Sequence, residues 1–534
     1  MPAQSQPLRF VHRGAIVSLA GVRPDRTLLA LLREDLGLAA VKEGCASGDC
    51  GACSVALAEA DGGSLRWRAS NSCIRLAHSI DGMAVWSAGD LARDPLLALD
   101  GAALHPAQQS MIDTHGSQCG FCTPGIVMNL FTLQQQCGLA PTRAQAQQAL
   151  SGNLCRCTGY RPILDAAQAM QQLPPAQVDE AGLLALLREI AAPADAADQQ
   201  PGAGDADHQQ ARSFYLAPRT LAQALWVRSR WPDARPVAGG TDLVLGISKG
   251  LQSHERLLDL TRVSELRRIA RADGQLTIGA AATLDDAFAA LQQDWPGLDD
   301  YLERFAGAPV RQTGTLGGNV VNGSPVGDGI ALLIALRAQL VLVRLDPATG
   351  QTGERRIAVE DFYLGYRRNP LAADELLAAI ELPLPGRPAL AGTSALGHWT
   401  RAYKISRRQE DDISALSLAL SLRIGDGRVL ACSIGVGGMA ATPMRARRTE
   451  ATLTGQPWSA DRVRAAMAVL EQEFEPLSDL RASAAYRRRA LANLLWRSWL
   501  ESQAGALPHA SRLAGLQPVL AHAARTVDTQ EAHS

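Results

Sequence analysis

Four cysteines near the start of the chain have the spacing of iron–sulfur ligands. Cys45, Cys50 and Cys53 follow the pattern Cys-x4-Cys-x2-Cys, and Cys73 lies further along. Plant-type [2Fe–2S] clusters are held by four thiolates with this spacing. Glycine permits positive φ angles, so a glycine-rich loop can curl and turn its backbone N–H groups toward the sulfides. The glycines of this loop are Gly44, Gly48 and Gly51. We therefore predict a [2Fe–2S] site here.

Zinc and a disulfide are the alternatives for this first set. Structural zinc sites usually show paired Cys-x2-Cys knuckles, and a structural disulfide needs an oxidising compartment. Neither explains a four-residue spacing followed by a two-residue spacing in a loop with so many glycines. The pattern favours iron over both alternatives.

A second set of cysteines follows. Cys119 and Cys122 form a Cys-x2-Cys pair, and Cys155 and Cys157 form a Cys-x-Cys pair. The Cys-x-Cys spacing is less usual for zinc, but the spacing alone leaves both iron and zinc open.

Helix signals surround this second set. Thr123 and Pro124 are expected as N-cap and first residue of a helix that runs to about residue 136. Thr142 and Gln145 form a capping box for a second helix, and a third begins at Pro162. Each cysteine pair should therefore lie at a helix terminus, in a small helical bundle.

Two glycine-rich segments further on are candidates for cofactor binding. The segment 236–243 looks like a strand followed by a turn, and its Gly239-Gly240 pair could bind a diphosphate through backbone N–H groups. The segment 311–319 is expected as a second glycine-rich loop, and 324–328 adds a hydroxyl and a carboxylate. The Rossmann fingerprint is absent. Cofactor binding and an ordinary turn both remain open on these residues alone.

Composition limits the class of protein. The 534 residues carry a formal charge of −1, so they lack the basic surplus expected of a nucleic-acid-binding protein. No apolar run reaches the ~20 residues that span a bilayer, and the start lacks the regions of a signal peptide. We expect a soluble cytoplasmic protein of three or four domains, without a nucleic-acid or membrane partner. Of the ten cysteines, Cys137 and Cys432 are left over, and we expect both to be buried.

Periodicity and turn signals predict an α+β multidomain protein. The first ninety residues should hold two hairpins, a helix capped by Thr27 and the cluster loop, which together suggest a ferredoxin-like β-grasp domain. We expect strands within 8–22 and at 54–57 and 65–69, and the helix at 27–36. A flexible linker should follow, after a short helix at 178–190. Later expectations are a helix at 220–231, an N-cap at Thr283, a solvated charge run at 401–412, a glycine turn at 435–439, a helix at 483–499 and a loose tail.

The two cysteine sets and the glycine-rich segments together resemble the xanthine dehydrogenase family of molybdenum hydroxylases. The motifs that carry the resemblance are Glu-Gly-Cys45, Cys50-Gly-Ala-Cys53, Gln118-Cys-Gly-Phe-Cys-Thr-Pro-Gly and Cys155-Arg-Cys-Thr-Gly-Tyr-Arg-Pro. The resemblance implies that the second set is also a [2Fe–2S] site, in a four-helix bundle. It further implies an FAD domain of the vanillyl-alcohol-oxidase type and a C-terminal domain like that of CO dehydrogenase flavoproteins. The implied parts are 1–92 and 93–174 for the clusters, a linker at 175–210, 211–388 for FAD, 389–502, and a tail at 503–534.

The resemblance also assigns FAD contacts. Residues 235–242 would line the diphosphate, Phe305 would pack on the flavin or adenine, and Leu377 would contact the isoalloxazine edge. The full set of implied contacts is Arg235, Pro236, Val237, Ala238, Gly239, Gly240, Thr241, Asp242, Phe305, Thr315, Gly318, Asn319, Asp328, Leu377 and Lys404.

The activity implied by the resemblance is electron transfer. Electrons would pass from a molybdenum cofactor on a large partner subunit through two [2Fe–2S] clusters to FAD and then to NAD⁺, in the oxidation of hypoxanthine and xanthine to urate. An (αβ)2 heterotetramer would result, and no residue of this chain is assigned as a catalytic acid or base. The same subunit of an aldehyde oxidoreductase or another molybdenum hydroxylase, and a zinc-stabilised scaffold without redox activity, are the alternatives.

Overall fold

A five-stranded sheet opens the fold. A computed structural model describes residues 7–138, 140–191, 213–346, 348–385 and 397–503. The sheet has the order β2-β1-β5-β3-β4, and all its pairs are antiparallel except β1 with β5. Its strands are β1 (Leu8–His12), β2 (Ala15–Leu19), β3 (Ser54–Asp61), β4 (Ser64–Asn71) and β5 (Ala84–Trp86). Thr27 caps α1 (Leu28–Ala30), which continues as a π-helical turn over Leu31–Asp35. The first hairpin and the capped helix are confirmed.

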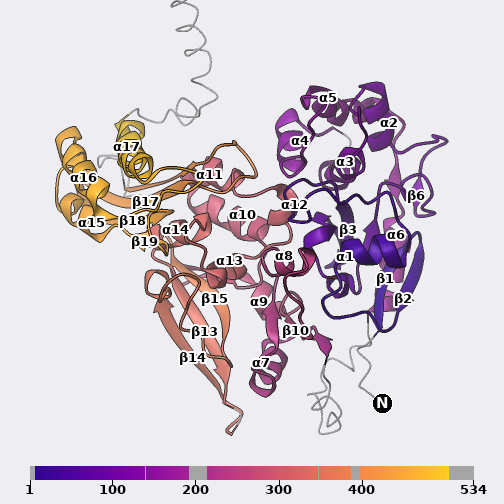
Figure 1. Ribbon diagram of the computed structural model, residues 1–534, viewed down its shortest axis with the longest axis horizontal. Helices are drawn as coiled ribbons and strands as arrows, with labels where there is room; N and C mark the ends of the chain where they lie inside the picture. The colour runs from indigo at the N-terminus through magenta and orange to yellow at the C-terminus, as the bar shows by residue number, and fades with distance from the viewer. Residues whose placement is uncertain (1–6, 139, 192–212, 347, 386–396, 504–534) are drawn as a thin grey trace, which may run out of the picture.

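Four helices pack together beside this sheet. They are α2 (Pro106–Asp113), α3 (Thr123–Cys137), α4 (Arg143–Ala149) and α5 (Arg161–Ala169), and they gather above β3 in Figure 1. The capping box of Thr142 and Gln145 is confirmed. The expected N-cap at Thr123 is wrong, because Cys122 occupies that position and the Thr123 hydroxyl instead lies 2.7 Å from that of Ser117.

The core of this first part is aromatic. Trp67 of the sheet contacts Trp86 and Phe131, with ring centroids 5.0 Å and 5.4 Å apart. The short pair β6 (Leu97–Ala98) and β7 (Gln177–Val178) precedes α6 (Glu180–Ile190), the short helix expected before the linker. The face of α6 that carries Leu183 and Leu187 packs into the same core. The remainder of the predicted linker, from residue 192, lies outside the described residues.

The middle part combines two sheets with helices between them. Its strands form a parallel sheet with the order β8-β10-β9 and an antiparallel sheet with the order β11-β12-β15-β13-β14. The strands are β8 (Phe214–Leu216), β9 (Arg235–Val237), β10 (Arg256–Asp259), β11 (Ile269–Ala272), β12 (Gln275–Gly279), β13 (Gln339–Leu345), β14 (Thr352–Ala358) and β15 (Leu376–Pro383). The helices are α7 (Leu221–Arg230), α8 (Leu243–Ser248), α9 (Ser264–Arg267), α10 (Leu284–Asp294), α11 (Asp299–Glu303), α12 (Ala308–Arg311), α13 (Leu316–Asn322) and α14 (Asp328–Ala335).

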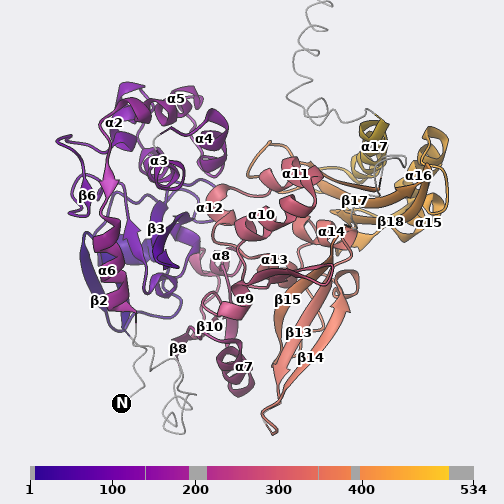
Figure 2. The same ribbon diagram turned by 180° about the vertical axis from the view of Figure 1, so that it is seen from behind.

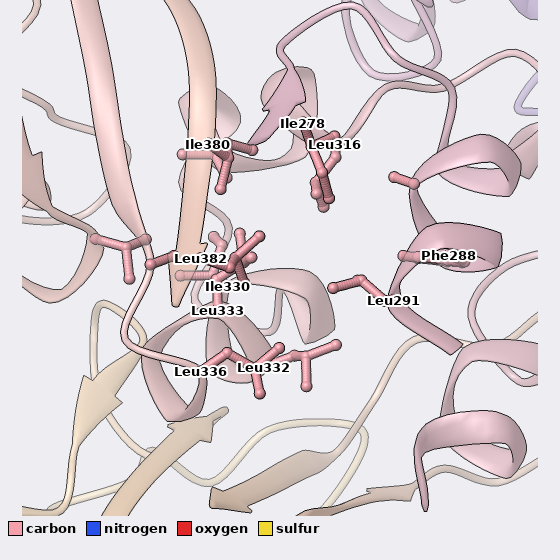
Figure 3. Packing of buried hydrophobic residues seen from close by; sticks show 14 of the residues in the cluster. Ile278, Phe288, Leu291, Leu316, Ile330, Leu332, Leu333, Leu336, Ile380 and Leu382 are labelled. Atoms are coloured by element: carbon pink, nitrogen blue, oxygen red, sulfur yellow. The ribbon is translucent and has the colours of Figure 1, made fainter. Parts of the chain in front are cut away.

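The larger sheet and the helices α10, α13 and α14 enclose the core of the middle part. Figure 3 shows Ile278 and Ile380 from the strands together with Leu291 from α10 and Ile330 from α14. Thr283 caps α10, as expected.

The C-terminal part is an antiparallel sheet covered by three helices, at the far end of the molecule from the first sheet (Figure 2). Its elements are β16 (His398–Ile405), β17 (Leu416–Gly425), β18 (Arg428–Gly437), β19 (Met444–Arg445), α15 (Arg447–Leu453), α16 (Ala460–Glu473) and α17 (Ala484–Gln503). The expectation of a wholly solvated charge run at 401–412 is wrong, because its first half is β16 and Lys404 is buried in an ion pair with Asp328.

Two further expectations need correction, and one region stays untested. The predicted glycine turn at 435–439 begins only after Gly437, because Gly435 pairs with Ala419 in β18. Gly435 is needed for space, since a Cβ there would lie 2.0 Å from the backbone oxygen of Ala331 in α14. Cys432 is buried as expected, but Cys137 is exposed at the end of α3. The predicted tail lies outside the described residues from 504 onward. Within the described ranges, no helix is long and apolar enough to cross a membrane.

Candidate cofactor sites

The first cysteine loop brings its four sulfurs together. The sulfurs of Cys53 and Cys73 are 3.2 Å apart and both residues are buried. Cys45 Sγ lies 3.4 Å from the backbone N–H groups of Ser47 and Cys50, which donate to it. Hydrogen bonds from Cys50 and then from Cys73 hold the pKa of the Cys45 thiol well below its ordinary value. This favours the thiolate form of Cys45, the form that binds metals, whereas hydrogen bonds with Cys45 raise the pKa values of Cys50 and Cys73.

The glycines of this loop act in two different ways. Gly48 and Gly51 have φ angles of 81° and 66°, as expected of a loop that curls around a cluster. Gly44 is not among the residues with positive φ; a Cβ there would instead lie 2.9 Å from Cys50 Sγ. The loop therefore needs Gly44 for space around a sulfur rather than for its backbone conformation.

The second set bridges the N-terminal ends of α3 and α5. Burial, and next the neighbouring Cys155 thiol, raise the pKa of Cys122 to about 12. A hydrogen bond with Cys119 raises the pKa of Cys157, which places these two thiols together as well. Cys119 and Cys157 are exposed, whereas Cys155 is buried. In the described part of the chain, no three or more His, Cys, Asp or Glu side chains are arranged to hold a single metal ion.

The two cysteine loops touch each other directly. The backbone N–H of Leu154 donates to the carbonyl oxygen of Cys50 at 3.0 Å, and Asn153 Nδ2 donates to that of Gly51 at 3.2 Å. A Cβ on Gly125, near the start of α3, would lie 2.0 Å from the oxygen of Gly51. The contact is therefore close enough to exclude any side chain at that point.

The first loop also touches the middle part on its other side. Ser248 Oγ, at the end of α8, donates to the backbone oxygen of Ala46 at 2.8 Å, and Lys249 Nζ donates to that of Cys45. The helix α8 begins directly after the glycine-rich turn at 238–242. The first cysteine loop consequently lies between the second cysteine set and this turn.

The turn after β9 packs closely on the segment that precedes α13, and it lines a cavity. A Cβ on Gly239 would lie 2.0 Å from the backbone oxygen of Thr313, and Gly240 has a φ of 74°. The expected second loop is instead mostly helical, because Thr315 caps α13 by accepting from the N–H of Gly318 at 3.0 Å. Gly318 and Asn319 therefore lie within α13.

A cavity of about 270 Å³ opens beside this turn, between the first and middle parts. Of the FAD contacts implied by the resemblance, it brings together Val237, Ala238, Gly239, Gly240 and Thr315. Those that do not line it are Arg235, Pro236, Thr241, Asp242, Phe305, Gly318, Asn319, Asp328, Leu377 and Lys404. The first part contributes a wall that includes Arg75 and Leu76, which sequence reasoning did not assign.

The residues outside the cavity have other surroundings. Phe305 packs against Phe288 with ring centroids 5.1 Å apart, and Leu377 of β15 lies in the core of the middle part. Lys404 Nζ and Asp328 Oδ2 form an ion pair at 3.1 Å. Asn319 Oδ1 is buried without a hydrogen-bond partner among the described residues, but it lies toward Gly329 rather than in the cavity wall. The fit to a cofactor therefore rests on the Gly239-Gly240 turn and the arginines that line the cavity.

Comparison with known proteins identifies three regions. Residues 96–168 match the family described as "[2Fe-2S] binding domain", and 209–385 match "FAD binding domain in molybdopterin dehydrogenase". Residues 401–502 match "CO dehydrogenase flavoprotein C-terminal domain". The chain is an iron–sulfur and FAD component of the molybdenum hydroxylase family. The first match covers the second cysteine set, so iron rather than zinc is the metal that this family would bind there.

Similar proteins include the xanthine dehydrogenases of Drosophila subobscura and Emericella nidulans, each 30% identical to this molybdenum hydroxylase component. The matches cover 92% and 91% of this chain but 39% and 38% of the relatives. The chain thus spans about two-fifths of the length of these relatives. Among solved structures, the carbon monoxide dehydrogenase of Hydrogenophaga pseudoflava, which lacks the Mo-pyranopterin moiety, gives a TM-score of 0.49 at 28% identity, covering 55% of this chain and 98% of that chain.

Proposed function

We propose that this chain is the electron-transfer subunit of a xanthine dehydrogenase. It would receive electrons from a molybdenum cofactor on a partner subunit and pass them through two [2Fe–2S] clusters to FAD and then to NAD⁺, while hypoxanthine and xanthine are oxidised to urate. The names of the relatives support the choice of xanthine dehydrogenase within the family.

The order of the sites in space carries the proposal. The second cysteine set is at the surface, the first set touches it through Cys50 and Gly51, and α8 connects the first set to the glycine turn. A redox chain needs its carriers as neighbours, and here hydrogen bonds join the first set to the second set on one side and to α8 on the other, so the three sites form a series. The cofactors supply the redox chemistry, whereas the protein supplies binding, orientation and electrostatics. No acid or base of this chain is assigned a catalytic role.

The exposed cysteines of the second set, Cys119 and Cys157, lie on a face that fits a partner subunit. Two residues next to ligand cysteines of this set carry exposed apolar side chains: Phe121, which precedes Cys122, is 48% exposed, and Leu154, which precedes Cys155, is 41% exposed. Exposed apolar side chains that gather in one area are typical of protein–protein contact sites. We place the molybdenum-binding large subunit on this face, with Gln118 at the contact, and two such pairs in an (αβ)2 assembly.

Two activity assays test the proposal. The chain purified alone should transfer electrons from NADH to an artificial dye, because that half-reaction needs only the flavin, and it should not oxidise purines. Adding the molybdenum subunit should restore NAD⁺-dependent oxidation of hypoxanthine and xanthine. Purine oxidation by the isolated chain would contradict the division between subunits. A reconstituted complex that prefers aldehydes over purines would assign it to another member of the family.

A further inference from the structure

The cavity between the first and middle parts has an excess of positive charge. Five arginines and two carboxylates line it; they are Arg68, Arg75, Arg219, Arg262, Arg267, Glu59 and Asp81. Both carboxylates are already paired. Glu59 lies 3.0 Å from Arg68 and 3.4 Å from Arg267, and Asp81 lies 3.2 Å from Arg262. No carboxylate in the cavity wall is left to neutralise a further arginine.

Arg75 is the arginine that needs an anion. Its Nε is buried without a hydrogen-bond partner in the described part of the chain, and its Nη2 lies 3.8 Å from Met83 Sδ, a weak acceptor. Burial, and next the charge of Arg68, lower the pKa of Arg75 to about 10, so it still carries its charge at pH 7. An isolated buried charge is costly unless an opposite charge accompanies it.

The backbone at Arg75 is fixed in place by its neighbours. The backbone oxygen of Arg75 accepts from the N–H of Leu28 at 2.7 Å. Ile74 and Leu76 on either side lie in a buried cluster that also contains Val237 of the middle part. Arg75 is thus anchored by the first part at its boundary with the middle part, and its side chain lines the cavity that the Gly239-Gly240 turn also lines.

We propose that Arg75 binds the diphosphate of FAD from the side opposite to the Gly239-Gly240 turn. The inference rests on the proposed FAD site and adds to it a residue from the cluster-bearing part of the chain. A guanidinium presents its N–H donors as a planar fork that matches two phosphate oxygens, whereas the glycine turn offers backbone N–H groups. FAD would then connect the first and middle parts through its diphosphate.

The test is the affinity of flavin-free protein for FAD and for riboflavin, which lacks the diphosphate. Arg75→Gln should weaken FAD binding by roughly tenfold to a hundredfold, as expected for hydrogen bonds to a charged group, and leave riboflavin binding unchanged. Arg75→Lys keeps the charge without the fork and should fall between Arg75→Gln and the unchanged protein. Arg93→Gln is the control, because Arg93 is exposed in the first part and does not line the cavity. The [2Fe–2S] EPR signals report whether each variant is folded.

The outcomes separate this inference from the proposed function. Unchanged FAD affinity in Arg75→Gln with its EPR signals intact overturns the role of Arg75, although the FAD site itself would stand. A variant that keeps FAD but loses affinity for NADH overturns it too, since the anion would then be the diphosphate of the nicotinamide nucleotide. If Arg75→Gln does not fold, inorganic pyrophosphate must compete with FAD on the unchanged protein and compete less on Arg75→Lys; equal competition overturns the inference. Failure of the unchanged protein to bind FAD would instead refute the proposed function, and this inference with it.

Discussion

The buried ion pair between Lys404 and Asp328 allows a quantitative test of how the middle and C-terminal parts are joined. Lys404 lies on β16 and is 5% exposed, and Asp328 begins α14 and is 6% exposed. Their charged atoms are 3.1 Å apart. Ser414 Oγ donates to Asp328 Oδ1 at 2.6 Å, and Lys404 Nζ donates to the backbone oxygen of Arg304 at 3.2 Å. The charges are therefore both paired and hydrogen-bonded.

The magnitude follows from the geometry. At 3.1 Å and an effective dielectric constant of about 20, the attraction is about 5 kcal/mol before the cost of desolvation. Lys404→Met keeps the apolar stem but leaves the Asp328 carboxylate buried and unpaired, which should cost about 3–5 kcal/mol. Adding Asp328→Asn removes the second charge and should recover more than half of that loss.

Hydrogen exchange of the amides in β16 and β17 gives the assay, because it reports the free energy of local opening in a multidomain chain that need not unfold in two states. Arg464→Met is the control: its ion pair with Asp461 is on the surface, with the two side chains 63% and 95% exposed, and its guanidinium lies 4.8 Å from the Trp496 ring centroid. A loss of less than about 1 kcal/mol is expected for it. The reasoning is refuted if Lys404→Met costs less than about 1 kcal/mol, or if the double variant is no more stable than the single one.

Three further predictions concern the cofactor sites and the first sheet. Cys50→Ser should remove one [2Fe–2S] EPR signal and spare the other; loss of both signals, or of neither, in folded protein would count against two separate sites. Gly239→Ala should abolish flavin binding while iron is retained, since its Cβ would lie 2.0 Å from the backbone oxygen of Thr313 and would displace the turn that lines the cavity. Gly240→Ala should lose less flavin, because it has a left-handed φ but no contact below 3.1 Å; equal flavin content in the two variants would argue against this turn as part of the flavin site. Burial raises the pKa of Asp90, but the neighbouring His12 ring, 3.3 Å away, and hydrogen bonds from Ser87 outweigh it and leave the pKa at about 2. Because folding lowers the pKa of Asp90, its carboxylate contributes about 2–3 kcal/mol to the free energy of unfolding above pH 4, and this contribution is lost toward pH 2. Asp90→Asn should therefore be less stable than the unchanged protein in thermal melts at pH 7. A difference in stability between the two proteins that does not narrow from pH 5 to pH 3 would contradict this.

Local signals in the sequence predicted helix starts well. Thr27, Thr142 and Thr283 each accept a hydrogen bond from a backbone N–H three residues further on. Such a bond depends only on neighbouring residues, so it can be read without knowing the fold. The spacing of the cysteines is informative for the same reason, since each ligand pair lies within one loop.

Features that depend on distant segments could not be read in this way. The glycines of the second glycine-rich segment suggested a loop, but a Cβ on Gly317 would lie 2.4 Å from the backbone oxygen of Ala280, so this glycine allows α13 to pack closely on the chain after β12. Lys404 looked solvated within its charge run because its partner, Asp328, is far away in the sequence. Arg75 gave no signal at all, since its surroundings exist only where the first and middle parts meet.

The contact between the two cysteine loops also joins segments that are far apart in the sequence, and it has the greatest consequence for function. Along the chain the first set precedes the second, and both precede the glycine turn; in space the first set lies in the middle. Gly125 does not have a positive φ, so its backbone would tolerate a side chain. Its need is for space, because a Cβ would lie 2.0 Å from the oxygen of Gly51. A glycine at the start of α3, which a helix does not favour, is therefore what lets the two cysteine loops lie close together. The clusters that they would hold are then neighbours, as electron transfer between them requires.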